Sequence, residues 1–282
     1  MTNIPDKLWD EISILLPKEK QNNTIGRPIV PYRKVLDDIM YILRTGCQWK
    51  MLPRKYGSGS TSHRRYQEWV QLDIFKKMWV RVLQLYDDKE GIKWTWQSLD
   101  SISIKSPLGG AMTGNNPTMD RSKLGTKRDI VTDEKGIPLS IVVISSAAST
   151  HDVKLVTDVV DNAVIKRHIS SPKTKDGRKR KQQHLCLDKA YNSKSVKQEI
   201  IKRGYVPHLP HKRNRGEVKK ETEQISNRKK HPARRWWVVE RTSSWHNRFR
   251  KLFTRYEKKI ENYLGLVQFS CCIIIYRKLI LG

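Results

Sequence analysis

Cysteines and long apolar runs are both scarce in this 282-residue sequence. None of the four cysteines has the spacing of a zinc site, and most have apolar neighbours, so we expect reduced, buried thiols in a cytosolic protein. The most apolar stretch, residues 263–276, is interrupted by polar side chains, and a membrane-spanning helix needs about 20 apolar residues. We therefore expect a core helix there and no membrane partner. The four cysteines are Cys47, Cys186, Cys271 and Cys272.

Acidic residues are also scarce, because 28 Asp and Glu stand against 56 Lys and Arg, and the net charge is +28. The basic excess runs along the whole chain. Such a chain repels itself and needs an anionic partner, for which nucleic acid is the leading candidate and a membrane surface the second. The N-terminus lacks the basic-then-apolar pattern of a signal peptide. We expect a cytoplasmic, nucleoid-associated protein.

The first 88 residues have the pattern of a small helical domain. Apolar stripes predict helices over residues 6–16 and 32–44, the second closed by Thr45-Gly46. A third helix begins near residue 60, where Ser60 or Thr61 is the expected N-cap. A glycine turn followed by a short basic helix is typical of a helix-turn-helix motif, and a helical bundle with a solvated basic face is the alternative. The expected DNA contacts are His63, Arg64 and Arg65 in the third helix and Arg27 in the preceding loop.

From Trp94 the hydrophobic period changes to that of a strand. Asp100 falls on the same side as Trp94, Trp96, Ile102 and Ile104, in a largely apolar register. A buried lone carboxylate costs several kcal/mol unless it is paired or bound to a metal. The alternative is a strand-end aspartate that faces solvent. Two further strands are predicted around the turn at residues 133–136.

A second carboxylate, Asp188, directly follows the short apolar run at residues 185–187. Aspartate is common where strands end, so simple turn chemistry is the alternative to a functional acid. The preceding stretch, residues 166–183, holds eight Lys or Arg and one Asp. It is either a solvated loop or a track for DNA near Asp188.

A third carboxylate, Glu240, stands alone in a long basic segment with helical periodicity. Its predicted face also carries Ser244, Asn247 and Lys251, and a solvent-facing Glu paired with a basic neighbour is the alternative. The opposite face is predicted to be an apolar core stripe formed by Val238, Thr242, Trp245, Phe249, Leu252 and Tyr256.

The three acids follow the order early strand, later strand and late helix, with spacings of 88 and then 52 residues. Only a folded domain brings them together. Carboxylates are the ligands that Mg²⁺ and Mn²⁺ prefer, and two such ions about 4 Å apart support phosphoryl transfer.

With these motifs the chain resembles the DDE transposases of bacterial insertion sequences, in the group named after insertion sequence five. The resemblance implies an α/β fold with an RNase H-like catalytic domain, a mixed sheet flanked by helices, over residues 89–282. A helix-turn-helix-like DNA-binding domain precedes it over residues 1–88. The motifs that carry the resemblance are residues 41–53, 60–69, 120–127, 150–152, 185–193 and 239–257.

The resemblance also implies that Asp100, Asp188 and Glu240 bind two Mg²⁺ or Mn²⁺ ions and perform catalysis. The implied reaction nicks the terminal inverted repeats hydrolytically and joins the freed 3′-hydroxyls to target DNA, without a covalent protein intermediate. Two ends must be held together, so a homodimer on double-stranded DNA is expected.

The sequence departs from this group near Glu240. Related transposases place a Tyr, an Arg and a Lys seven before, four before and seven after the glutamate, where this chain has Ala233, Trp236 and Asn247. In the catalytic domain we expect phosphate contacts from Lys189, Arg235, Arg241, Asn247, Arg248 and Lys251.

Two other hypotheses compete with an active transposase. The first is a catalytically inactive DNA-binding protein derived from one, which would bind specific DNA without cutting it. The second is a general nuclease or RNA-binding protein, which would show no preference for terminal inverted repeats.

Overall fold

The computed structural model describes residues 3–19, 29–115, 123–145, 152–166, 182–210 and 237–281. The expected contacts at Arg27 and Arg235, and the motif residues Thr150 and His151, lie outside these ranges. Of the cysteines, Cys186, Cys271 and Cys272 are buried, Cys47 is partly exposed, and all four are free thiols.

The N-terminal part is helical, as predicted. Gly46, with φ of +74°, ends the second helix in the left-handed conformation that favours glycine. The third helix begins earlier than expected, and its N-cap, Ser58, makes no side-chain capping bond, so the prediction of a cap at Ser60 or Thr61 is wrong. The elements are α1 (Asp6–Ser13), α2 (Tyr32–Thr45), the 3₁₀ turn η1 (Trp49–Met51), α3 (Gly59–Gln71) and α4 (Ile74–Glu90).

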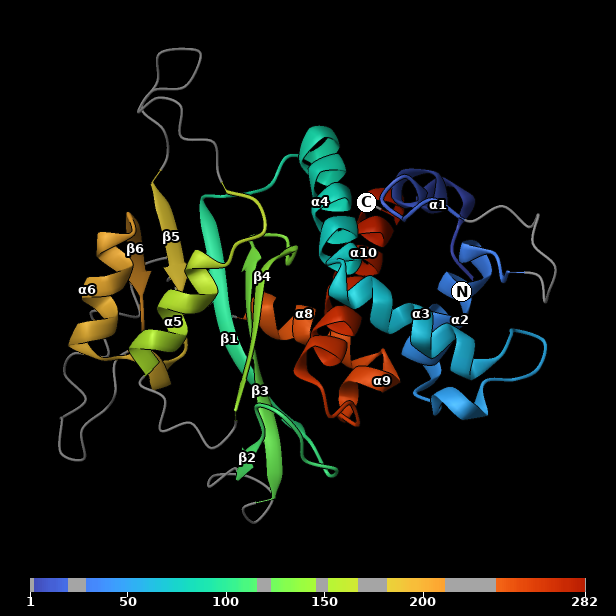
Figure 1. The fold of residues 1–282 in the computed structure, drawn as a ribbon. Helices are drawn as coiled ribbons and strands as arrows, with labels where there is room; N and C mark the ends of the chain where they lie inside the picture. Colours follow the sequence, from blue (N-terminus) through green and yellow to red (C-terminus); the bar gives the residue numbers. More distant parts are fainter. Residues whose placement is uncertain are drawn as a thin grey trace.

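A six-stranded mixed sheet follows (Figure 1). Its main order is β4-β3-β1-β5-β6, with the short β2 paired to the far end of β3. β1, β3 and β4 are antiparallel, whereas β5 and β6 run parallel to β1. The strands are β1 (Trp96–Lys105), β2 (Gly114–Asn115), β3 (Leu124–Asp133), β4 (Pro138–Ser145), β5 (Gln183–Cys186) and β6 (Tyr205–His208).

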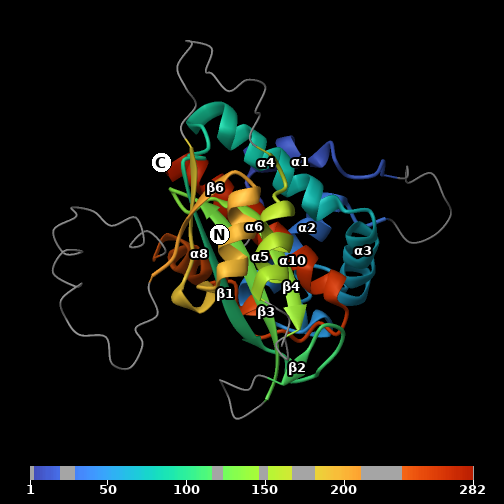
Figure 2. The same cartoon turned by 90° about the vertical axis from the view of Figure 1, so that its left-hand side faces the viewer.

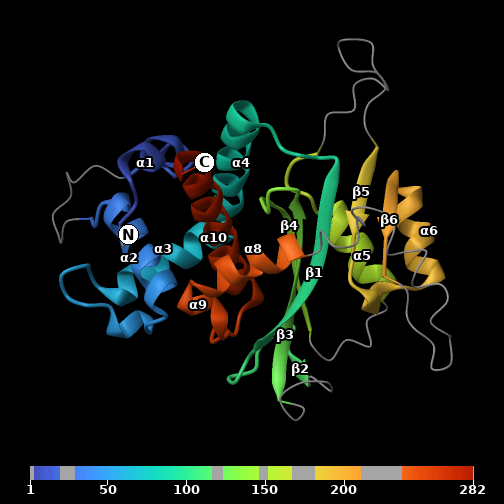
Figure 3. The same cartoon turned by 180° about the vertical axis from the view of Figure 1, so that it is seen from behind.

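Helices cover both faces of the sheet. Figure 2 shows α5 (Asp152–Asp161) and α6 (Lys194–Lys202) in front of one face, where they bury the apolar side chains of β1, β3 and β5. On the other side, visible in Figure 3, lie α8 (Trp237–Asn247), α9 (Arg250–Phe253) and α10 (Ile260–Leu281). This mixed sheet with helices on both faces, preceded by a helical part, confirms the predicted RNase H-like architecture.

The helix α10 forms the centre of the larger hydrophobic core, which confirms the prediction for residues 263–276. It packs on α4 and α3 as well as on β4, so the core is shared by the N-terminal helices and the sheet. By length and composition α10 could also cross a membrane, but 67% of its most apolar window is buried inside the protein, as in a core helix.

Two local predictions were wrong. The alternative of a strand-end aspartate at Asp100 is wrong, because β1 continues to Lys105. The predicted stripe of buried side chains holds for Val238, Thr242, Phe249 and Leu252, but it is not one continuous helix, because α8 ends at Asn247 and the chain turns before α9 begins. Beyond α9 the period no longer applies, and Tyr256 is 50% exposed. Trp245 is only partly buried.

Candidate active site

Asp100 lies in the middle of the central strand and is partly buried. Its partner across the antiparallel pair is Ile130, which belongs to the core under α10, so Asp100 points to the side of the sheet that faces α8 and α10. Sequence alternation therefore predicted its side correctly.

Asp188 follows β5 and opens the 3₁₀ turn η3 (Lys189–Tyr191). Its Oδ1 accepts a hydrogen bond of 2.6 Å from the backbone N–H of Lys189, which fixes the carboxylate at the strand end. Ser98 of β1 pairs with Cys186 of β5 in parallel register. Asp100 and Asp188 each lie two residues further on, so the register continues toward them from adjacent strands.

Glu240 lies in the first turn of α8 and is exposed. α8 packs against β1 and β3, which brings Glu240 toward Asp100. Burial raises the pKa of Asp100 to about 6; the backbone N–H of Ser101 opposes this, and the negative charges of Glu240 and Asp188 add to it. The three acids, far apart in sequence, thus lie within electrostatic reach of one another.

These carboxylates do not form a closed metal cage. In the described ranges no group of three or more His, Cys, Asp or Glu side chains is arranged to hold a metal ion. The donor chemistry nevertheless suits Mg²⁺ or Mn²⁺, because such ions use one or two carboxylates and complete their shell with water and substrate phosphates. The three carboxylates repel one another, and a bound divalent cation would relieve this repulsion.

A fourth acid, Asp129, was missed by the sequence analysis. It is 1% exposed, it lies opposite Ser101 on the α5 side of the sheet, and neither carboxylate oxygen has a hydrogen-bond partner of normal geometry. Burial raises its pKa to about 6, against the opposing effects of the Ser101 hydroxyl and Lys127. The alternation of side chains along β3 was the sequence signal that could have found Asp129.

Of the residues predicted to contact DNA around Glu240, some are exposed and others contact the rest of the protein. Lys189 and Arg248 are exposed. Arg241 is partly buried between the rings of Trp237 and Trp245, at 4.9 and 5.1 Å, and donates to the carbonyl of Lys135.

Two further predicted contacts are engaged inside the protein. Asn247 accepts a 3.4 Å hydrogen bond from the buried Arg128. Lys251 is 5% exposed and forms a 3.4 Å ion pair with Glu257.

Of the predicted contacts on α3, only Arg64 is fully exposed. His63 stacks on Trp49 with 4.6 Å between ring centroids, and burial lowers its pKa. Arg65 pairs with Glu68 at 2.6 Å and lies over the ring of Tyr32.

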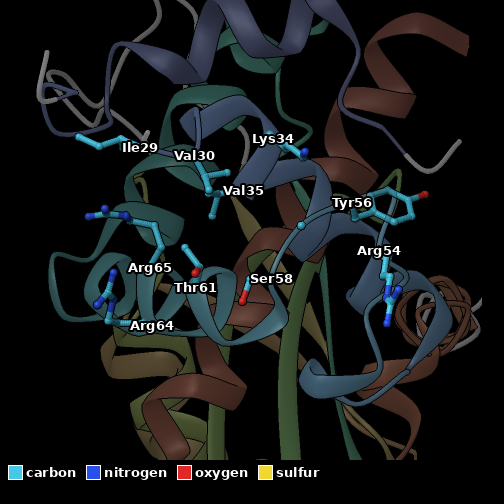
Figure 4. Close-up of a pocket in the computed structure, with 11 residues that line it drawn as sticks. Ile29, Val30, Lys34, Val35, Arg54, Tyr56, Ser58, Thr61, Arg64 and Arg65 are labelled. Atoms are coloured by element: carbon cyan, nitrogen blue, oxygen red, sulfur yellow. The ribbon is translucent and has the colours of Figure 1, made fainter. Parts of the chain in front are cut away.

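A basic cleft of about 580 Å³ lies between α2 and α3 (Figure 4). Arg64 and Arg65 lie at one side of it, and Lys34 and Arg54 at the other. Ser58 and Thr61, at the uncapped start of α3, lie between them. Free N–H groups of a helix start and nearby cations together favour an anion such as phosphate. The sequence analysis missed Lys34 and Arg54, although Arg54-Lys55 is a visible basic pair beside a turn.

Comparison with known proteins gives consistent matches. A family model described as "Transposase DDE domain" matches residues 98–275, and one described as "Putative transposase of IS4/5 family" matches residues 4–79. A protein of Burkholderia cepacia named "Putative transposase for insertion sequence element IS402" is 29% identical over 61% of this chain and 72% of its own. The Mos1 mariner paired end complex with Mn is 11% identical, with a TM-score of 0.30 over 85% of this chain and 83% of that chain.

Proposed function

Since the chain belongs to the DDE transposase family, we propose that it binds the terminal inverted repeats of an insertion sequence, nicks the ends hydrolytically and joins the freed 3′-hydroxyls to target DNA. The proposal includes a homodimer on DNA, because the reaction needs two ends held together. It also places the protein in the bacterial cytoplasm, at the nucleoid.

One observation supports this proposal most directly: the charges of Asp188 and Glu240 act on Asp100 across three separate elements. A protein tolerates such repulsion where an acid cluster has a cationic partner. Structural carboxylates usually have a basic neighbour instead, and none of these three has an ion pair with a described side chain.

In the proposed mechanism Asp100, Asp188 and Glu240 would hold Mg²⁺ or Mn²⁺ through carboxylate oxygens. When bound, two such ions supply the charge that activates the attacking oxygen and stabilises the leaving oxygen. Asp188 is held in place by the Lys189 N–H, and Asp100 by the central strand. The exposed Glu240 is free to adjust its rotamer as the substrate arrives.

For DNA binding we propose that the cleft between α2 and α3 receives the repeat. Lys34, Arg54 and Arg64 supply positive charge at its two sides. The four basic residues of the cleft and the net charge of +28 favour phosphate contacts, which make affinity fall steeply with salt.

The test is cleavage of a DNA fragment that carries the element's own terminal repeats, with Mg²⁺ or Mn²⁺ and with chelator. We expect metal-dependent nicks at the repeat boundary. The variant Asp188→Asn should bind the fragment with nearly wild-type affinity but cut it at least about 10³-fold more slowly, as expected when electrostatic stabilisation of the transition state is lost.

Three other outcomes would each exclude part of the proposal. Normal cleavage by Asp188→Asn would refute the site. Specific binding without any cut by the wild-type chain would identify an inactive DNA-binding protein. Cutting without preference for the repeats would identify a general nuclease.

A further inference from the structure

A second basic pocket lies at the junction of the N-terminal and C-terminal helices and shares no residue with the acid site or the cleft. This junction pocket, of about 200 Å³, is lined by Trp245, Arg248, Phe249, Ile274, Arg277 and Lys278. Figure 3 shows the elements that form it, with α8 and α9 beside α10. α2 contacts α9, and the guanidinium of its Arg44 lies 5.9 Å from the centroid of the ring of Phe249, which lines the pocket.

Three cations therefore line this pocket, Arg44 lies beside it, and no acid is among the lining residues. Lys278 lies 5.1 Å from the centroid of the Trp245 ring, which positions its ammonium group. Within the part of the chain that the structure describes, none of Arg44, Arg248, Arg277 and Lys278 forms an ion pair. The rings of Phe249 and Trp245 hold Arg44 and Lys278 through cation–π contacts but do not neutralise their charges.

The cations repel one another in the free protein. Burial lowers the pKa of the Arg277 guanidinium, and the positive charges of Arg44 and Arg248 lower it further. Natural proteins retain such unfavourable charge clusters chiefly where function requires them. An anion in the pocket would relieve this repulsion, and the pocket is too small for a base pair but large enough for a phosphate group.

We propose that the junction pocket binds a backbone phosphate of the DNA on which the protein acts. The bound phosphate would hold the DNA strand in position between the N-terminal helices and the acid site. This inference rests on the proposed function. It assigns a role to Arg44, Arg277 and Lys278, for which no sequence motif indicated one, and it gives the exposed Arg248 a defined partner. A phosphate held from both parts of the chain would fix the distance between the recognised sequence and the cut.

Arg277→Gln separates this role from a structural one, because the two predict opposite changes in stability. If Arg277 binds phosphate, removing its charge relieves repulsion, so the free variant should melt at the same temperature as the wild type or higher. Its affinity for duplex DNA should fall about tenfold, equally for repeat and unrelated sequences, as expected for loss of one charged hydrogen bond. The slope of log K against log salt should become about one unit shallower.

Lys76→Gln is the matched control, because it removes one positive charge from an exposed position on α4, outside the pocket. It should bind DNA like the wild type. A lower melting temperature of Arg277→Gln with unchanged salt slope would overturn the inference in favour of a packing role. Equal affinity of Arg277→Gln and Lys76→Gln for DNA would also overturn the inference. In that case, binding and cleavage of the repeat DNA by the wild type would leave the proposed function intact. A wild-type chain that binds no DNA would overturn both.

A second measurement locates the phosphate on the DNA. Arg248 directly follows the end of α8, eight residues after Glu240, and the helical rise over this span is about 12 Å, which corresponds to three or four nucleotides of a B-form strand. A neutral methylphosphonate at that distance from the scissile phosphate should weaken wild-type binding but add nothing to the loss in Arg277→Gln. Full additivity at every scanned position would contradict the contact.

Discussion

His246, a buried residue of α8, makes the stability of the molecule depend on pH. It is fully buried, its Nδ1 lies 2.7 Å from the Ser270 hydroxyl, and its Nε2 lies 3.9 Å from the Cys271 sulfur. Burial lowers the pKa of His246 well below its ordinary value, and the positive charge of Arg128 lowers it further. The imidazole is therefore neutral in the folded protein, and folding opposes its protonation.

This residue predicts a pH-dependent stability. Below about pH 6.5 the unfolded chain binds a proton at His246 that the folded chain does not, so its contribution to the free energy of unfolding is lost as the pH falls. His246→Gln should be less stable than the wild type at pH 8, but the difference should shrink by up to about 1.4 kcal/mol per pH unit below pH 6.5. Urea unfolding of both proteins at pH 8, 6.5 and 5.5 measures it.

Buried acids change the free energy of unfolding with pH in the opposite direction to His246. Burial raises the pKa values of Asp38 and Asp133, so these groups favour folding more as the pH falls. They are present in both proteins and cancel in the difference. A wild-type to variant gap that stays constant from pH 8 to 5.5 would show that His246 protonates freely in the folded state.

The start of α3 is the element on which the basic cleft depends. A side-chain carbon added at Gly59 would lie 1.7 Å from the backbone oxygen of Trp49, so only glycine allows η1 and α3 to approach this closely. The same approach places Trp49 against His63 and Tyr66. The geometry of the cleft is thus set by one close backbone contact.

Gly59→Ala should therefore destabilise the protein by about 1–3 kcal/mol or more through overpacking. Ser60→Ala, one residue later and exposed, should have little effect. Thermal unfolding of the two variants provides the measurement. Equal melting temperatures would mean that η1 moves away from α3 at little cost, and the cleft would then not be rigid.

At the scale of single elements, the sequence predicted each acid as a candidate site residue because each one interrupts a local pattern. Asp100 interrupts an apolar register, Asp188 ends a buried run, and Glu240 stands alone among basic residues. Their mutual approach followed from the order of the elements that carry them.

The directions of basic side chains could not be predicted in the same way. His63 and Lys251 are polar residues in predicted DNA-contact positions, yet packing on Trp49 and the ion pair with Glu257 turn them inward. Both partners lie outside the helix of the residue that they contact, so the periodicity of that helix contains no signal for them. Tyr256 was misplaced because periodicity was extended across the end of α8.

At the scale of the whole molecule, the N-terminal helices and the sheet share one core. The Trp79 indole of α4 donates a 3.2 Å hydrogen bond to the carbonyl of Pro138 in β4, and the Tyr66 hydroxyl of α3 donates to the carbonyl of Asn262 in α10. Gly265 of α10 lies against Val70 and Tyr66 of α3 without room for a side chain. The N-terminal part is therefore built around a helix from the other end of the chain.

A fragment of residues 1–88 should not fold alone, because its apolar faces would lose α10. We expect low helicity and no cooperative melt by circular dichroism, in contrast to the full chain. A fragment that melts cooperatively would show that the shared core is dispensable and that the N-terminal helices are an independent domain.

The central claim is that Asp100, Asp188 and Glu240 hold the catalytic metal, and metal-specific rescue of cleavage tests it most directly. Asp188→Cys replaces a hard oxygen ligand by a thiolate, which Mg²⁺ binds poorly and Mn²⁺ accepts more readily. On terminal-repeat DNA we predict no cleavage by this variant in Mg²⁺, partial recovery in Mn²⁺, and no cleavage by Asp188→Ala in either. Wild-type rates for Asp188→Cys in Mg²⁺ would contradict a metal contact at Asp188.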